Sequence, residues 1–201
     1  MYYAYIGTGQ ISYQIKSEQL AYEFALEYYK KNGNADMVRR LEAAPPTMTV
    51  PLPAAYVSLR DEYMHGAGIG TTHDMDSVVT GIFLPSLQFH EHTLGEKINL
   101  WRGKLSSRSR AFSLWDKMQA TDLTQQVPQL DIPVYSFGGA YDYTCAHPLA
   151  KEYFEKLNAP VKGFYTFANS AHSPVFEEPE KALRILQEDV LAGANNLGGT
   201  K

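Results

Sequence analysis

The sequence is poor in features that would direct the protein to a membrane, to nucleic acid or to an oxidising compartment. Cys145 is the single cysteine among 201 residues, so an internal disulfide bond is excluded. A lone thiol is typical of a reducing setting, and we expect a cytoplasmic protein. No apolar run approaches the roughly 20 residues that span a bilayer, and the N-terminus lacks the basic and apolar regions of a signal peptide. With a net charge of −4 and a pI of about 5.9, neither nucleic acid nor a membrane surface is an expected partner.

The composition that remains is that of a folded globular protein. Hydrophobic residues make up 44% of the chain and charged residues 20%, which separates it from disordered sequences. A chain of 201 residues is long enough for one domain with a sizeable core. The 14 tyrosines indicate aromatic-lined surfaces, although they do not identify a ligand.

Three short apolar runs are predicted to form buried β-strands, at residues 2–6, 134–137 and 164–167. The last two are separated by a helical pattern that opens at Pro148, a residue favoured in the first turn of a helix. Strand–helix–strand units of this kind are almost always right-handed parallel crossovers. The sequence therefore predicts an α/β fold with about three parallel strands and flanking helices.

Helical patterns dominate the region between the first and second strands. The clearest predicted helices cover residues 17–32, 35–43, 94–105 and 112–118. Ser17 is the expected N-cap of the first helix. A final helix is expected from residue 179 until Gly193, with a buried face formed by Leu183, Leu186 and Val190.

This order of elements predicts a division of the chain. Residues 1–12 and 124–193 are expected to form the α/β core, and residues 13–123 an inserted helical cap. Residues 194–201 read as a flexible tail.

Asp142 and His172 lie in the loops that follow the second and third predicted strands. Reactive groups in open parallel sheets gather outside the carboxyl ends of the strands. We therefore expect Asp142 and His172 to lie side by side at one edge of the sheet, as an acid–base pair.

The order of these motifs resembles the C-terminal part of α/β-hydrolase-fold enzymes, in particular the proline-iminopeptidase-like branch. The run Gly-Gly-Ala-Tyr-Asp at 138–142 is similar to the loop that carries the triad acid. Asn-Ser-Ala-His-Ser-Pro at 169–174, with Phe-Glu-Glu-Pro at 176–179, is similar to the loop that carries the triad histidine. Residues 2–9 look like the strand after the nucleophile helix, and residues 17–123 like the cap.

The resemblance implies a partial α/β-hydrolase fold and a serine hydrolase that needs no cofactor. Its substrate would be a small-molecule ester, an amide or a peptide, with an aminopeptidase-like activity as one form. Asp142 would be the triad acid and His172 the general base.

The nucleophile of such an enzyme has no counterpart in these residues. The family places its serine in a Gly-x-Ser-x-Gly elbow upstream of the cap, and neither this motif nor an oxyanion loop occurs here. We therefore expect the chain alone to be inactive and to need an N-terminal half. The alternative is a non-catalytic remnant or interaction module, whose exposed sheet edge at the strand of residues 2–6 pairs with a partner or with a second copy.

Three other residues near the pair carry a thiol or hydroxyl that could replace the missing nucleophile. Cys145 lies three residues after Asp142, but nothing places it on a sharp strand–helix elbow, and an inert thiol that is buried or half-buried is the favoured interpretation. Ser170 and Ser173 are too close to His172 in sequence to face its ring from a separate turn. Both are interpreted as loop residues that form hydrogen bonds.

The remaining histidines and a glycine run could suggest a metal or phosphate site. His90 and His92, with His65 and His73, show no recognised metal-ligand spacing, so we predict no metal. The glycines at residues 66–70 lack the Lys-Ser/Thr that follows a phosphate loop, and a turn or hinge is favoured.

Overall fold

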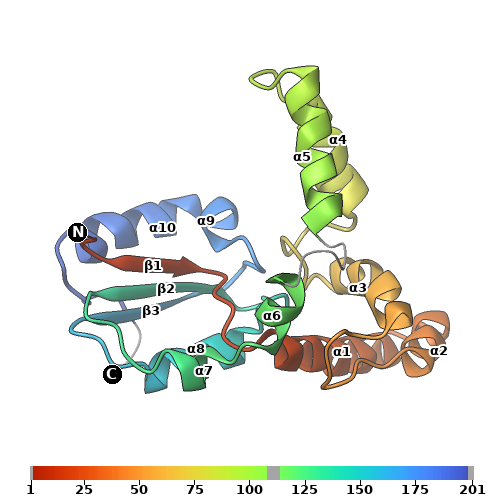
Figure 1. The fold of residues 1–201 in the computed structure, drawn as a ribbon, viewed down its shortest axis with the longest axis horizontal. Coiled ribbons are helices and arrows are strands. Elements are labelled where there is room, and N and C mark those ends of the chain that lie inside the picture. Colours follow the sequence, from red (N-terminus) through yellow and green to blue (C-terminus); the bar gives the residue numbers. More distant parts are fainter. Residues whose placement is uncertain (1, 108–113, 199–201) are drawn as a thin grey trace.

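A computed structural model describes residues 2–107 and 114–198. Its strands are β1 (Tyr5–Thr8), β2 (Val134–Gly139) and β3 (Lys162–Phe167), and they form one sheet in the order β1-β2-β3 (Figure 1). Both pairings are parallel. The predicted α/β class with three parallel strands and many helices is confirmed.

Short helices cover both faces of the sheet. Figure 1 shows α9 (Pro174–Glu177) and α10 (Pro179–Ile185) along one face, and α7 (Leu123–Gln126) and α8 (His147–Lys156) along the other. Because side chains alternate along a strand, β2 contributes to two cores. Val134 packs with Phe154 on the α8 side, whereas Tyr135 packs with Ile185 on the α10 side.

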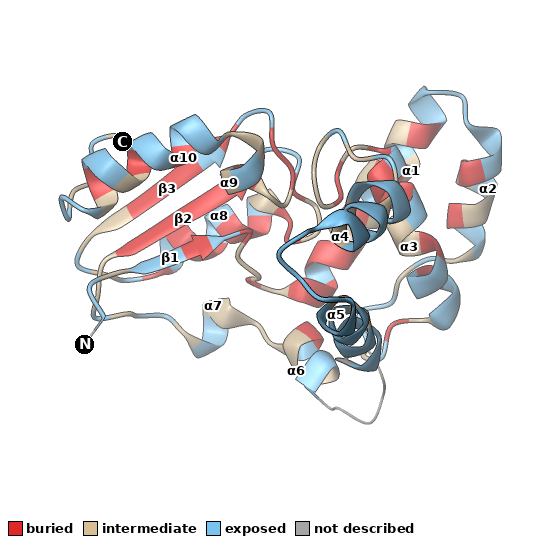
Figure 2. Cartoon of the chain, turned by 90° about the horizontal axis from the view of Figure 1, so that it is seen from above, coloured by how far each residue is buried: buried red, intermediate tan, exposed pale blue. Residues whose placement is uncertain are grey.

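The region between β1 and β2 is helical and has a core of its own. Its helices are α1 (Gln14–Lys31), α2 (Ala35–Ala43), α3 (Ala54–Gly66), η1 (Val79–Phe83), α4 (Leu84–Gln88), α5 (Leu94–Ser107) and α6 (Leu114–Ala120). The buried residues of α1, α2 and α3 form one cluster around Ala25, Leu41 and Tyr56. In contrast, α4 and α5 project from the rest of the chain, and every residue from 79 to 106 is exposed or only partly buried (Figures 1 and 2).

The strand predicted at residues 2–6 is placed too early and was wrongly expected to be buried. Tyr2 and Tyr3 are 84% and 91% exposed and precede β1, which begins at Tyr5. Within β1 only Gly7 is buried. The reason is that β1 is an edge strand. In the described sheet it has a neighbouring strand, β2, on one side only, so its side chains are less covered than those of β2.

Helix α1 begins one turn earlier than predicted. Its N-cap is Tyr13, and Ser17 lies inside the helix, where its N–H donates to the carbonyl of Tyr13. The Ser17 hydroxyl instead accepts a hydrogen bond from the N–H of Ala146, at 3.1 Å. Helix α2 has the predicted bounds, because the Asn34 side chain caps it by accepting from Met37 N.

The buried face of the last helical segment, α10 with η2 (Leu186–Val190), differs from the prediction. Ala182, Ile185 and Asp189 are buried, whereas Leu183 is 55% exposed. The buried face differs from the predicted one because it carries Asp189. The carboxylate of Asp189 is buried and accepts hydrogen bonds from the N–H groups of Asn196 and Leu197. This part of the predicted tail is therefore anchored to the core.

Two of the predicted segments extend beyond the described residues. The first residues of the helix predicted at 112–118 and the last three residues of the tail lie outside the described residues. The division into core and cap stays a prediction. None of the described helices combines the length and the hydropathy needed to cross a bilayer.

Candidate active site

Asp142 and His172 meet at the carboxyl ends of β2 and β3. The Nδ1 atom of His172 lies 3.0 Å from Oδ2 of Asp142. Asp142 is 1% exposed, and its second oxygen, Oδ1, accepts from the N–H of Cys145 at 2.9 Å. Both carboxylate oxygens are thus engaged, which fixes the carboxylate and turns Nδ1 of the imidazole toward it.

The other imidazole nitrogen, Nε2, is not hydrogen-bonded to any residue that the structure describes. The side chain of His172 is 31% exposed and lines a pocket of about 490 Å³. The opposite walls of this pocket come from α1, α3 and α6, and include Gln14, Glu18, Arg60, Asp61, Asp116 and Gln119. A ligand bound there would lie between the sheet edge and the helical region.

The two loops approach each other backbone to backbone. The N–H of Ala140 donates to the carbonyl of Phe167, and the N–H of Tyr141 to the carbonyl of Ser170. A Cβ atom at Gly139 would overlap with the carbonyl oxygens of Ser170 and Ala171. This close contact explains why a glycine ends β2.

The glycine run at residues 66–70 forms a turn that rests on both loops. The carbonyl of Ile69 accepts from Tyr143 N at 3.4 Å, and the carbonyl of Gly70 accepts from His172 N at 3.3 Å. Gly68 has a φ of +68°, a left-handed conformation that favours glycine. The run serves as a turn, as predicted, and it also contacts the candidate site.

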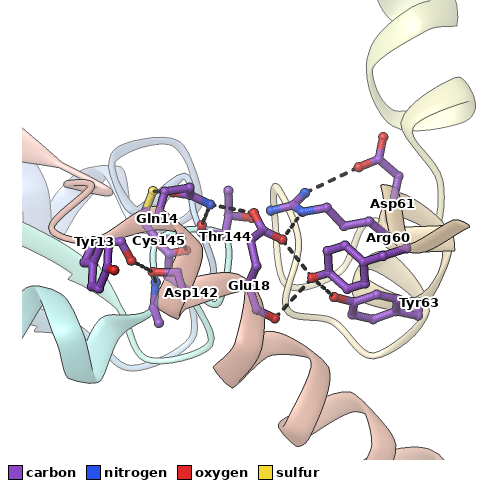
Figure 3. A network of polar contacts seen from close by, with 12 residues as sticks. Tyr13, Gln14, Glu18, Arg60, Asp61, Tyr63, Asp142, Thr144 and Cys145 are labelled. Carbon is purple, nitrogen blue, oxygen red and sulfur yellow. Dashed lines mark hydrogen bonds and ion pairs between the residues drawn. The ribbon is translucent and has the colours of Figure 1, made fainter. Parts of the chain in front are cut away.

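A buried ion pair between α1 and α3 forms part of the pocket wall (Figure 3). The Nε of Arg60 donates to Oε2 of Glu18 at 2.5 Å, and the Tyr56 hydroxyl donates to the same oxygen at 2.8 Å. Glu18 is 3% exposed. Its negative charge raises the pKa of Arg60 against the opposing effect of burial.

Gln14 connects this ion pair to the loop of Asp142 (Figure 3). Its Nε2 donates to Oε1 of Glu18 at 2.6 Å and to the carbonyl of Thr144 at 2.9 Å. Neither Gln14 nor Glu18 is among the site residues predicted from the sequence. The signal was present, because Gln14 and Glu18 are polar residues four positions apart on the face of α1 that carries the buried Ala21 and Ala25.

Two of the three alternative nucleophiles, Cys145 and Ser170, are buried. Cys145 is 4% exposed, and burial together with the charge of Asp142 raises the pKa of its thiol. Ser170 is fully buried and donates its hydroxyl hydrogen to Glu178 at 2.7 Å. Ser173 is the N-cap residue of α9.

Of the four histidines considered for a metal site, His65 and His73 form hydrogen bonds to backbone carbonyls. His65 is buried and bonds through its ring to the carbonyl of Asp61, and the ring of His73 bonds to the carbonyl of Gly68. His90 and His92 are exposed between α4 and α5. Over residues 2–107 and 114–198, no three His, Cys, Asp or Glu side chains are grouped so that they could hold a metal ion.

Comparison with known proteins connects the chain to hydrolases. No protein-family model matches it. It is 26% identical over 181 residues to the probable aminopeptidase YbaC of Bacillus subtilis (strain 168), a match that covers 89% of this chain and 54% of that protein. The chain thus spans about half the length of this relative. The esterase EaEST from Exiguobacterium antarcticum is 18% identical, with a TM-score of 0.33 over 54% of this chain and 45% of the esterase. A hydrolase-like relation is what the similarity to the B. subtilis protein supports.

Proposed function

We propose that this chain supplies the acid and the general base of a serine hydrolase of the α/β-hydrolase family. The observation that carries the proposal is the 3.0 Å contact between Asp142 Oδ2 and His172 Nδ1 at the carboxyl edge of a parallel sheet. In this chemistry the histidine removes the proton of the serine hydroxyl through Nε2 and later gives it to the leaving group. Asp142 holds the proton on Nδ1 and stabilises the imidazolium that forms.

The nucleophile and the oxyanion-hole donors come, in this proposal, from a second polypeptide segment. The 201 residues contain no Gly-x-Ser-x-Gly, and Cys145 and Ser170 are both buried, so neither is placed to attack a substrate. Without a nucleophile and an oxyanion hole, little of a serine hydrolase's rate enhancement remains. The chain alone is therefore inactive.

The substrate is an ester or amide, and we favour a peptide with a free amino group. The pocket beside His172 holds three carboxylates, Glu18, Asp61 and Asp116, against one guanidinium, Arg60. This excess of negative charge favours a protonated amine over a carboxylate. The name of the B. subtilis relative, a probable aminopeptidase, supports the same choice.

A fluorophosphonate probe, which reacts with activated serines, tests the proposal. The chain is incubated with the probe alone and after co-expression with the polypeptide encoded immediately upstream. We expect labelling of the upstream polypeptide in the second case only, and its loss with His172→Ala but not with His90→Ala, an exposed control. Labelling that survives His172→Ala would refute the role of the histidine. An upstream sequence without Gly-x-Ser-x-Gly would refute the split enzyme.

A non-catalytic interaction module is the second candidate, and the open edge of β1 favours it. Tyr5 N and Gly9 N donate to carbonyls next to and within β2. By alternation, the N–H and C=O groups of Ile6 and Thr8 face the other way, along the open edge of the described sheet. Ile6 is also 42% exposed. Such an edge is a template for a strand from another chain.

A further inference from the structure

Residues 67–74, which follow α3, contact the loops of both Asp142 and His172. Beyond the backbone contacts of Ile69 and Gly70, the ring of His73 stacks on the ring of Tyr141, with centroids 3.8 Å apart and an angle of 17° between the planes. Tyr141 directly precedes Asp142. The segment therefore contacts the chain on both sides of the acid, as well as the backbone of the histidine.

One carboxylate joins this segment to the loop of His172. Glu177, at the end of α9, accepts from the N–H of His73 through Oε1 at 2.6 Å. Its Oε2 accepts from the N–H of Ala171, the residue before His172, at 3.0 Å. The neighbouring Glu178 binds the start of the same loop. Its Oε1 accepts hydrogen bonds from the N–H of Asn169 and from the Ser170 hydroxyl.

We propose that Glu177 is a positioning residue for His172. Its two hydrogen bonds connect residues 67–74 to the histidine loop, so that Nδ1 of His172 stays directed at Asp142. The proposal rests on the proposed function for its catalytic meaning, but not for its geometry. Glu177 does not touch the imidazole and acts through the backbone of Ala171.

The chemistry of the site requires a carboxylate there. Both oxygens of Glu177 face backbone N–H donors from different segments, and an ionised carboxylate accepts both in charge-assisted hydrogen bonds. A glutamine has one oxygen and one NH₂ group, so one of the two N–H groups would face a donor. The substitution Glu177→Gln therefore breaks the link at one end while keeping the volume of the side chain.

Nuclear magnetic resonance of the histidine side chains in the full 201-residue chain tests this inference without any catalytic assay. Long-range ¹⁵N–¹H correlation shows which ring nitrogen of His172 is protonated, and solvent exchange of the Nδ1 proton shows how well that proton is held. Glu180→Gln is the matched control, because Glu180 is an exposed glutamate in the first turn of α10.

We expect the parent chain and Glu180→Gln to show one His172 tautomer, protonated at Nδ1. Glu177→Gln should show a mixture of tautomers and about tenfold faster exchange of the Nδ1 proton, the equivalent of one lost hydrogen bond. An unchanged tautomer and exchange rate in a folded Glu177→Gln chain would overturn the positioning role. A parent chain without the Nδ1 proton would instead contradict the proposed function.

Tyr141→Leu gives a second test if Glu177→Gln does not fold. The side chain of Tyr141 is 37% exposed, and its replacement removes the stacking on His73 without touching the hydrogen bonds of Glu177. We expect faster exchange of the His172 Nδ1 proton in this variant too. No change would contradict a positioning role for residues 67–74.

Discussion

Gly9, the residue after β1, lies directly against the imidazole of His172. A Cβ atom at Gly9 would come within 2.7 Å of both Nδ1 and Cε1 of the ring. Gly9 has a φ of +55°, so a side chain there would also be strained. The first strand and the histidine loop are thus fitted to each other across 163 positions of sequence (172 − 9).

Gly9→Ala is expected to displace the ring of His172 and to break its contact with Asp142. Gly33→Ala is the control, because Gly33 has a similar φ of +70° but no atom within 4 Å of its ideal Cβ. The backbone strain of about 1–2 kcal/mol should therefore be common to both variants. Loss of the His172 Nδ1 proton signal in Gly9→Ala alone would confirm the steric contact. The same spectrum in both variants would contradict it.

The buried pair of Glu18 and Arg60 is expected to dominate the stability of the helical region. Arg60→Met leaves the Glu18 carboxylate buried without its cation and should lower the free energy of unfolding by about 3–5 kcal/mol. Arg184→Met removes an exposed pair with Glu188 and should cost less than about 1 kcal/mol. Chemical denaturation measures both values.

Adding Glu18→Gln to Arg60→Met provides a further check, because it removes the unpaired charge. We expect the double variant to regain part of the lost stability. Equal decreases in the free energy of unfolding for Arg60→Met and Arg184→Met would show that the buried pair stabilises the chain no more than the exposed pair does.

Strands β2 and β3 and the candidate pair could be predicted because their signals are local. The cores of β2 and β3 are short runs dominated by apolar and aromatic residues, α2 is bounded by Asn34 and Ala44, and each loop of the pair follows a strand directly. The buried charges could not be predicted in this way. Glu18 and Arg60 are 42 residues apart, and each taken alone is typical of an exposed helix position.

The last helical segment, α10 with η2, also contains a buried charge that the sequence pattern did not predict. Leu183 fits an apolar periodicity with Leu186 and Val190, yet the face that carries Asp189 is the buried one. That carboxylate is stable inside because three donors surround it, namely Tyr165 OH, Asn196 N and Leu197 N. Two of these donors belong to the segment predicted to be a flexible tail, so the sequence pattern gave no reason to place a charge there.

Asp189 should make the stability of the chain depend on acidic pH. Burial opposes ionisation, but hydrogen bonds from Leu197 N, Tyr165 OH and Asn196 N together lower the pKa of Asp189. A carboxyl group with a lowered pKa stabilises the fold above its unfolded pKa of about 3.9, and this contribution is lost as pH falls through the folded value.

The comparison of wild type with Asp189→Asn measures this contribution. We expect the variant to be less stable at neutral pH by about 1–3 kcal/mol, with the difference shrinking as the pH falls below about 4. Asp131→Asn, at an exposed position, is the control. A difference between wild type and Asp189→Asn that stays constant from pH 6 to pH 3 would contradict the assignment.

The open edge of β1 is expected to mediate association with another strand. Ile6→Lys adds a charge to this edge and should weaken binding to the upstream polypeptide, or self-association of the chain. Tyr3→Lys is the control, because Tyr3 is 91% exposed and precedes the strand. Sedimentation velocity over a range of concentrations measures the effect. Association that is equal in both variants would place the interface elsewhere.

The rate of hydrolysis by the chain together with the proposed upstream polypeptide tests the central claim most directly. With an aminoacyl ester or amide as substrate, we expect activity from the assembly and none from the 201-residue chain alone. Asp142→Asn should lower the turnover rate of the assembly by about 10⁴-fold, because the imidazole would be held in the wrong tautomer. An assembly with Asp142→Asn that turns over as fast as the wild type would contradict the assignment of Asp142 and His172 as the acid–base pair.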